Sequence, residues 1–329
     1  MKVSRTALAI VPQIWYDMRM KTSEETFMTS AEAAKRWGIS DRRVRILCEG
    51  GLVKGAAHEG KIWRIPASAE KPRDGRVQRG LGIPRELRSL FAEVDALKAK
   101  LAAMRPLTDG ERSSLRDAFL VDYTYASNAI EGNTLTRSET ALVLSGMTIG
   151  EKPLKDHLEA TGHRDAFAFL EEFVASGAAL TESFVRKLHS LVLADKPMDR
   201  GVYRRIPVII TGASHTPPQP YMVATLMETW VRDLTRTKKH PLVAAAEFHV
   251  RFEAIHPFID GNGRTGRLLA NFTLMCAGYL PISVKYENRR AYYEAFTAYH
   301  VAGDLKPMLR IFAEGERLRL EEYLKILGS

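Results

Sequence analysis

The hydrophobic residues of this chain recur mostly at helical spacing, with charged residues between them. A clear case lies between Pro84 and Met104, where the apolar positions are Leu87, Leu90, Phe91, Val94, Leu97 and Leu101. Such spacing predicts an amphipathic helix. Because the pattern stays almost wholly helical from there to the C-terminus, we expect a mainly α-helical protein.

Capping chemistry marks where these helices begin and end. The segments Thr108–Glu111 and Thr136–Glu139 each carry the threonine and glutamate of a capping box. Pro153 and Pro241 suit the first turn of a helix. Glycines stand where three predicted helices should end, at Gly132, Gly146 and Gly177.

One stretch departs from the helical pattern. It opens with a β-branched run of Val208, Ile209, Ile210 and Thr211, and Gly212 and Pro217-Pro218 follow it. β-Branched residues favour strands, and glycine and proline favour turns. We therefore expect a short β-hairpin that projects between helices.

The first seventy residues predict a helix, a glycine turn and a second helix. The first helix follows Thr29, the turn is at Gly38, and Ser40 is placed to cap the second helix. Residues 55–66 then predict a hairpin that turns at Glu59-Gly60. After it, residues 66–84 are rich in Pro, Gly, Lys and Arg without an apolar period, which indicates a linker.

This order of elements, ending in Trp63-Arg-Ile-Pro66, resembles the small winged helix-turn-helix domains of the excisionase and MerR-like group over roughly residues 27–71. The second helix would then lie in a DNA major groove and the hairpin against phosphates. The candidate DNA contacts are Arg42, Arg43, Arg45, Lys61 and Arg64. The alternative is that these cations form a solvated face and the domain docks a protein.

Composition narrows the class of protein further. The net charge of +9 favours polyanionic partners, although a modest excess over a long chain also serves solubility. Cys48 and Cys276 fit neither a disulfide framework nor a zinc site. The N-terminus has no signal-peptide cleavage site, and no apolar run is long enough to cross a bilayer. We expect a cytoplasmic protein without membrane association.

The segment from His256 to Arg267, with the sequence HPFIDGNGRTGR, carries the candidate chemistry. Its glycines open the N-terminal end of a predicted helix, where backbone N–H groups and the helix dipole hold phosphate. Arg264 and Arg267 add guanidinium donors to the same place. Asp260 supplies a hard oxygen ligand for Mg²⁺, and His256 is a natural base for a hydroxyl nucleophile.

These twelve residues match every fixed position of the HPFx[DE]GNGRxxR signature of the Fic family, and the resemblance covers roughly residues 112–312. It implies a helical Fic core with a β-hairpin flap. It also implies transfer of AMP from ATP, with Mg²⁺, to a Ser, Thr or Tyr hydroxyl of a protein target.

The resemblance also implies a role for each residue. His256 would be the general base and Asp260 the magnesium ligand, while Asn262 would contact the α-phosphate and Arg264 the β-phosphate. The backbone of Gly261 and Gly263 would complete the anion site. Flap residues Ile209, Ile210 and Thr211 would dock the target. Tyr292 and Tyr293 fall where the family lines the adenine pocket, although core packing explains tyrosines at helical spacing equally well.

Upstream, Ser127, Glu131 and Gly132 match the [ST]xxxE[GN] inhibitory motif of Fic proteins. The resemblance implies that Glu131 pairs with Arg267 and so denies that guanidinium to the γ-phosphate of ATP. A related hypothesis is that Glu131 also positions water to remove AMP from modified protein.

Three functions remain open from sequence. The first is AMP transfer to a protein. The second is a DNA-binding regulator whose Fic core serves as a nucleotide-responsive or scaffolding domain. The third, another phosphoryl transfer, is disfavoured because Doc-like kinase members carry lysine where this chain has Gly263, and because phosphocholine-transferring members carry repeat domains that are missing here.

We therefore divide the chain into four parts: a winged helix-turn-helix domain over residues 1–71, a linker and amphipathic helix over 72–110, a Fic domain with its inhibitory helix over 111–315, and a C-terminal helix over 316–329. A homodimer is also expected, because helix-turn-helix domains usually read paired half-sites.

Overall fold

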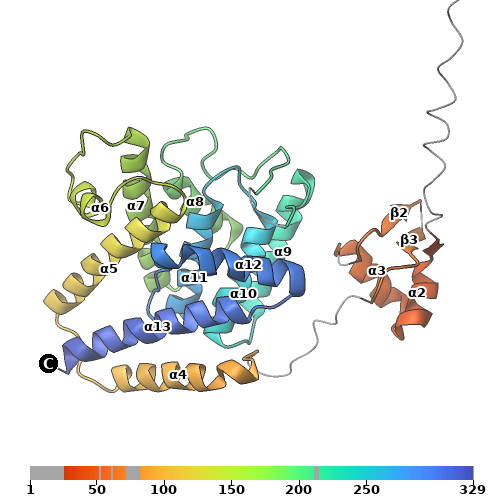
Figure 1. The fold of residues 1–329 in the computed structure, drawn as a ribbon, viewed down its shortest axis with the longest axis horizontal. Coiled ribbons are helices and arrows are strands. Elements are labelled where there is room, and N and C mark those ends of the chain that lie inside the picture. Colours follow the sequence, from red (N-terminus) through yellow and green to blue (C-terminus); the bar gives the residue numbers. More distant parts are fainter. Residues whose placement is uncertain (1–25, 52, 61, 72–81, 211–214, 329) are drawn as a thin grey trace, which may run out of the picture. The chain divides into compact units, whose positions relative to one another are not determined.

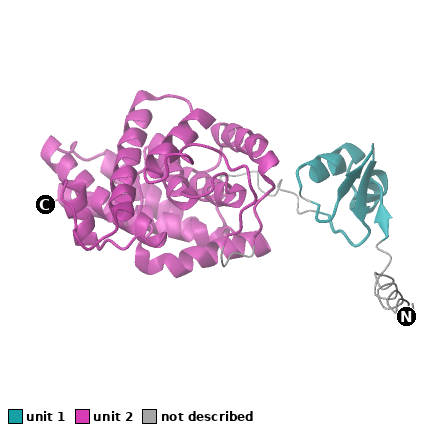
Figure 2. Cartoon of the chain, turned by 90° about the horizontal axis from the view of Figure 1, so that it is seen from above, with its two compact units in different colours: residues 1–78 teal, residues 79–329 magenta. Residues whose placement is uncertain are grey.

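The computed structural model describes residues 26–51, 53–60, 62–71, 82–210 and 215–328 (Figure 1). The chain divides into two compact units, residues 1–78 and 79–329 (Figure 2). The described residues are mainly helical, as the apolar spacing predicts.

The first unit holds two helices and a three-stranded antiparallel sheet. Its elements are β1 (Phe27–Met28), α2 (Ser30–Trp37), α3 (Asp41–Glu49), β2 (Ala57–Glu59) and β3 (Ile62–Pro66), with strand order β1-β3-β2. Two expected details are confirmed: the side chain of Ser40 caps α3, and Glu59 pairs with Ile62 across the hairpin turn. A small core of Ala33, Trp37, Val44, Leu47 and Ile65 joins the helices to the sheet.

The described residues of the second unit form helices joined by turns and loops, with no strand. Its elements are η1 (Arg85–Leu87), α4 (Arg88–Ala102), α5 (Asp109–Ile130), α6 (Arg137–Leu144), α7 (Leu154–Ser176), α8 (Glu182–Val192), η2 (Pro220–Met222), α9 (Val223–Arg236), α10 (Pro241–Ile255), α11 (Asn262–Cys276), η3 (Tyr286–Asn288), α12 (Arg289–Ala302) and α13 (Lys306–Leu327).

The predicted capping boxes are confirmed at α5 and α6. In each, the threonine side chain accepts a hydrogen bond from the third helical N–H, and the glutamate there accepts one from the threonine N–H. Gly177 ends α7 in the left-handed conformation, with φ of 66°. Local sequence thus sets the ends of these helices.

The core of the second unit consists of two hydrophobic clusters, and α10 and α11 contribute to both. One cluster packs Trp230, Phe248, Phe252 and Phe258 among α5, α7, α8 and α9. The other packs residues of α10 and α11 against α4, α12 and α13. The turn between α10 and α11, which carries the motif, is therefore held from two sides.

Two expected domain boundaries are corrected by this packing. Leu87, Phe91 and Val94 belong to the second cluster, and α4 packs along α13 (Figure 1). The amphipathic helix is therefore part of the second unit rather than of a linker. The boundary expected at residue 315 falls inside α13, which is one continuous helix from Lys306.

The expected β-hairpin is also corrected. Residues 208–210 and 215–219 form no strand in the structure, and Thr211 lies outside the described residues. The β-branched run indicates a strand, but Pro207 before it and Pro217-Pro218 after it remove backbone donors that a ladder needs. The segment has no strand ladder in its described part.

Candidate functional site

The motif forms the turn from α10 to α11. His256 ends α10 with φ of 49°, a left-handed conformation that is unusual for a residue with a side chain. Gly261 precedes α11 with φ of 75°, which glycine adopts without strain. These two reversals turn the chain sharply, so that the first N–H groups of α11 are free to face one point.

Asn262 holds this turn closed. Its side-chain Nδ2 donates to the carbonyl of Phe258 at 2.9 Å, and its Oδ1 accepts the N–H of Phe258 at 2.9 Å. The side chain is buried. Both ends of the amide are engaged in this way, so the side chain shapes the loop, and its expected contact with the α-phosphate stays a prediction.

His189 of α8 supports the turn from below. Its ring stacks on Phe258 with the centroids 3.6 Å apart. Gly201 N–H donates to its Nδ1 at 2.9 Å, and its Nε2–H donates to the carbonyl of Asp260 at 2.9 Å. Burial is the main reason that the pKa of His189 falls to about 4. The imidazole of His189 is therefore neutral at physiological pH.

Arg204 ties the turn to the segment expected to be the flap. Its Nε donates to the carbonyl of His256 at 2.7 Å, and its Nη2 donates to the carbonyl of Pro218 at 2.5 Å. Ile209 in the same segment is 91% exposed. The flap segment is thereby anchored beside His256 while its aliphatic side chain faces solvent.

Asp260 lies partly exposed at the rim of the turn. Lys196 pairs with its Oδ2, and the N–H of Gly261 donates to its Oδ1 at 2.6 Å. Burial alone would raise the pKa of Asp260, but the Lys196 hydrogen bond and the charge of Arg264 lower it to about 2. An ionised, partly exposed carboxylate fits a magnesium ligand, although Lys196 occupies one of its oxygens here.

The imidazole of His256 is largely buried. Burial lowers its pKa to about 4; the backbone carbonyl of Glu253 opposes this shift, and the charge of Arg204 adds to it. Its Nδ1 lies 3.8 Å from Oε2 of Glu253 and has no hydrogen-bond partner. The ring is therefore neutral at pH 7, the state that a general base requires.

Arg267 is held by the end of α5. Its Nε donates to Oγ of Ser127 at 2.9 Å, and its Nη2 donates to the Ser127 carbonyl at 2.7 Å and to Oε1 of Glu131 at 2.8 Å. A Cβ added to Gly263 would lie 2.2 Å from Oε1 of Glu131. The carboxylate of Glu131 thus lies on the first turn of α11, where an anion would bind.

Arg264 faces the other way. It is 1% exposed, and its Nη1 lies 3.1 Å from Oε1 of Glu159 while its Nη2 lies 3.5 Å from Oδ1 of Asp260. Its Nε has no hydrogen-bond partner. The guanidinium is therefore buried with unused donor capacity beside the α11 N-terminus.

The two candidate adenine contacts lie differently. Tyr292 is 1% exposed and shares a hydrogen bond of 2.6 Å with Nε2 of His249, so it belongs to the core, which corrects its assignment as a nucleotide contact. Tyr293 is half-exposed, and its hydroxyl donates to the carbonyl of Ile130 at 3.1 Å. Only Tyr293 borders the end of α5 from an accessible position.

Comparison with known proteins places this site in a family. A sequence model described as Fic/DOC family matches residues 179–274, which include the whole motif. A solved portion of Fic-1 from C. elegans is 30% identical, with a TM-score of 0.64, and the match covers 72% of this chain and 71% of that one. The chain belongs to the Fic/DOC family.

Two further relatives of this Fic chain cover similar ground. A Fic domain-containing signaling protein from Bacteroides thetaiotaomicron is 28% identical, with a TM-score of 0.66, over 72% of this chain and 98% of its own. The protein named protein adenylyltransferase Fic from Drosophila willistoni is 34% identical over 71% of this chain and 47% of its own length. The chain thus spans about half the length of the curated relatives it matches.

The predicted DNA contacts of the Fic chain belong to the first unit. Arg42 and Arg45 are exposed on α3, and Arg43 is half-buried there, but Arg45 pairs with Asp41. Arg64 of the hairpin pairs with Glu59 at 3.0 Å. Lys61 lies outside the described residues.

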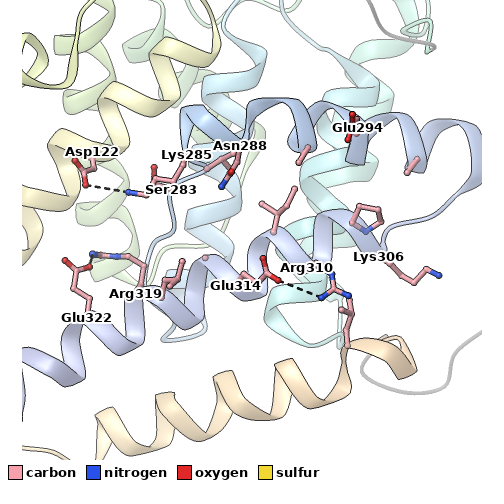
Figure 3. A pocket seen from close by; sticks show the side chains of 18 of the residues that line it. Asp122, Ser283, Lys285, Asn288, Glu294, Lys306, Arg310, Glu314, Arg319 and Glu322 are labelled. Carbon is pink, nitrogen blue, oxygen red and sulfur yellow. Dashed lines mark hydrogen bonds and ion pairs between the residues drawn. The ribbon is translucent and has the colours of Figure 1, made fainter.

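A groove of about 920 Å³ lies between α5, α12 and α13 (Figure 3). It contains none of the motif residues. Its charged groups are partly paired with each other, with Lys285 lying 3.6 Å from Asp122 and Arg310 lying 3.8 Å from Glu314. The groove is thus separate from the Fic motif.

Within the described ranges, no three His, Cys, Asp or Glu side chains gather into a metal-binding group. No helix there is both long and apolar enough to span a bilayer.

Sequence reasoning missed three charged residues at the site. Glu253 precedes His256 by three positions on α10, Glu159 reaches Arg264 from α7, and Lys196 reaches Asp260 from beyond α8. Only Glu253 carried a local signal, because residues three apart on a helix are neighbours. The other two meet the motif through tertiary packing.

Proposed function

We propose that this chain transfers AMP from ATP to a hydroxyl group of a protein, and that Glu131 holds it inactive. The observation that carries the proposal is the carboxylate of Glu131 against Gly263, paired with Arg267 at 2.8 Å. An anion already lies where the helix dipole and Arg267 would receive the triphosphate.

In the proposed reaction, Nε2 of His256 takes the proton of the target hydroxyl. The hydroxyl oxygen forms a bond to the α-phosphorus of ATP, the bond from that phosphorus to the bridging oxygen breaks, and pyrophosphate leaves with the electron pair. The N–H groups at the start of α11, with Arg264 and Arg267, stabilise the charge on the phosphates. Mg²⁺, when bound, would neutralise phosphate charge, and Asp260 would hold it.

The target would dock beside His256 along the segment of Ile209 and Ile210, with Thr211 in the same stretch. Ile209 is exposed, and Arg204 fixes the base of the segment to the His256 turn. Recognition of an extended backbone there would place a hydroxyl near the imidazole.

The proposed brake is a competition for Arg267. With Glu131 in place, the γ-phosphate meets a carboxylate instead of a guanidinium. The Ser127 bonds hold Arg267 in the orientation that pairs with Glu131, and Gly132, with φ of 92°, turns the chain away directly after it.

The test compares two radioactive ATP labels. Glu131→Gly is incubated with Mg²⁺, cell lysate and ATP labelled at the α- or the γ-phosphate. We expect protein labelling from the α-label alone, much weaker labelling by wild type, and none by Glu131→Gly/His256→Ala. Glu151→Gly, which removes an exposed glutamate outside the motif and the inhibitory segment, should match wild type. Labelling from the γ-label alone would replace AMP transfer with phosphoryl transfer.

The reverse reaction is part of the proposal. Glu131 lies close enough to the phosphate site to position a water for hydrolysis of the AMP ester. Modified target incubated with wild type and Mg²⁺ should lose its label, while Glu131→Ala should leave the label in place. Retention of label with both proteins would remove this activity.

DNA binding by the first unit is a second candidate function. It rests on the exposed Arg42 and the half-buried Arg43 on α3, a helix that follows a tight turn and precedes a hairpin. Arg42→Glu/Arg43→Glu should abolish retention on duplex DNA at low salt, because phosphate contacts dominate such binding. Lys35→Glu/Lys54→Glu is the charge-matched control, since both lysines are exposed. Equal retention by all three proteins would favour protein docking.

A further inference from the structure

The carboxyl of Glu253 lies behind the imidazole of His256. Glu253 stands three residues before His256 on α10, and its Oε2 is 3.8 Å from Nδ1 of that histidine. Both side chains are largely buried. The distance is longer than a hydrogen bond, but such contacts commonly tighten only when substrate binds.

Unused hydrogen-bonding capacity marks this contact. Nδ1 of His256 and Oε1 of Glu253 are both buried without a hydrogen-bond partner. An unpaired polar group in the core is unfavourable. Nδ1 of His256 lies 3.8 Å from Oε2 of the same carboxyl, so we expect another state of the protein to complete this contact.

Gly266 of α11 provides the seat for this carboxyl. A Cβ added there would lie 2.5 Å from Oε1 of Glu253 and 3.0 Å from Nδ1 of His249. The absence of a side chain at residue 266 thus lets the carboxyl lie against the helix whose N-terminus faces the phosphates.

We propose that Glu253 is a positioning residue for His256. Its carboxyl holds the imidazole with Nδ1–H inward and Nε2 outward, and its ionised form stabilises the imidazolium that forms when Nε2 takes the hydroxyl proton. This inference rests on the proposed function, and it assigns to a residue outside the signature the task of orienting the base.

Other charged groups also act on this pair. Burial raises the pKa of Glu253 to about 8; the charge of Glu131 on α5 adds to the rise, and Arg267 on α11 opposes it. From α12, Tyr292 and Tyr293 face Glu253, and its charge adds to the burial that raises their pKa values.

The groups around His256 act on its own pKa. Burial, Arg204 and His215 lower it, and Glu131 and the Glu253 backbone raise it. Removing Glu131 takes away one charge that raises the pKa of His256, while the carboxyl of Glu253 stays beside Nδ1 of the ring. The effect of Glu253 on His256 is therefore best measured in the Glu131→Gly protein.

The experiment measures kcat and the KM for ATP across about pH 6 to about pH 9 in the Glu131→Gly background. We expect kcat to rise as Glu253 ionises. Adding Glu253→Gln should remove that rise, lower kcat about tenfold or more above it, and leave KM for ATP within about twofold. Adding Glu247→Gln, on the same helix but paired with Lys239, should change neither quantity.

A second readout does not depend on catalysis. The ¹⁵N NMR shifts of the His256 ring, identified by their loss in His256→Ala, should show an inflection at the same pH as the rise in kcat. Glu253→Gln should abolish it, and Gly266→Ala, which displaces the carboxyl, should move it. If no AMP transfer is found but the inflection changes in the two variants as expected, the contact between Glu253 and His256 is supported. Only the proposed function is then wrong.

Two results would overturn the proposal. One is an inflection that persists unchanged in Glu253→Gln and in Gly266→Ala. The other is a loss of kcat that is equal at every pH, because that would mean Glu253 only supports the fold.

Discussion

Replacing Glu131 with glycine should strengthen ATP binding while weakening the fold. The substitution removes one hydrogen bond of 2.8 Å to Arg267, which is 4% exposed, whereas Glu131 itself is 32% exposed. Hydrogen bonds to charged groups contribute about 1.5–3 kcal/mol. Because water reaches Glu131, we take the lower part of that range, about 1.5–2 kcal/mol.

The same free energy appears with opposite sign in two measurements. In ATP binding, relief of the competition should tighten Kd about 10- to 30-fold, since each 1.4 kcal/mol is about tenfold. In unfolding, Arg267 loses one partner but keeps both bonds to Ser127. The Tm should therefore fall by only about 3–8 °C, since about 2–4 °C corresponds to each kcal/mol in a domain of this size.

Calorimetry and thermal unfolding on wild type, Glu131→Gly and Glu151→Gly provide the assay. We expect tighter ATP binding together with a lower Tm only in Glu131→Gly, and saturating ATP should restore part of the lost stability. An unchanged Kd, or a tighter Kd without loss of stability, would refute the idea that Glu131 and the phosphates compete for Arg267.

Three further predictions follow from the same contacts. Gly263→Ala should lower the Tm of wild type much more than that of Glu131→Gly, because the atom its Cβ meets at 2.2 Å belongs to Glu131; an equal loss in both would contradict this. Since burial holds the pKa of His256 near 4, kcat/KM of Glu131→Gly/Glu253→Gln, in which the titration of Glu253 is removed, should show no loss near pH 6.5 and should fall only in stronger acid; a loss of activity centred near pH 6.5 would mean a solvated imidazole. Lys196→Ala should lower the Mg²⁺ concentration needed for half-maximal labelling, because the ammonium pairs with Asp260; a higher requirement would assign Lys196 to phosphate binding instead.

Much of the fold could be read from local sequence. The capping boxes at Thr108 and Thr136 and the glycine after α7 act within a few residues, so the sequence contains the whole cause. The flap segment was mispredicted because β-branched residues favour strands only when a partner strand is in reach, and flanking prolines limit that pairing.

The site residues likewise fall into those that local sequence predicts and those that tertiary packing brings together. The motif from His256 to Arg267 is contiguous, so its place at the start of α11 follows from order along the chain. Lys196 and Glu159 contact the motif from other parts of the chain, so no local sequence pattern predicts them. Tyr292 was a candidate adenine contact through the resemblance, with core packing as the equal alternative; helical spacing gives a face but not its partner, and here that face packs on His249.

The most direct test of the account is a structure of the Glu131→Gly protein with a non-hydrolysable ATP analogue and Mg²⁺. The account predicts phosphates against the N–H groups of Gly261 to Gly263, Arg267 turned to the γ-phosphate, and the α-phosphorus facing Nε2 of His256. A nucleotide bound elsewhere, or an α-phosphorus out of reach of that imidazole, would contradict it.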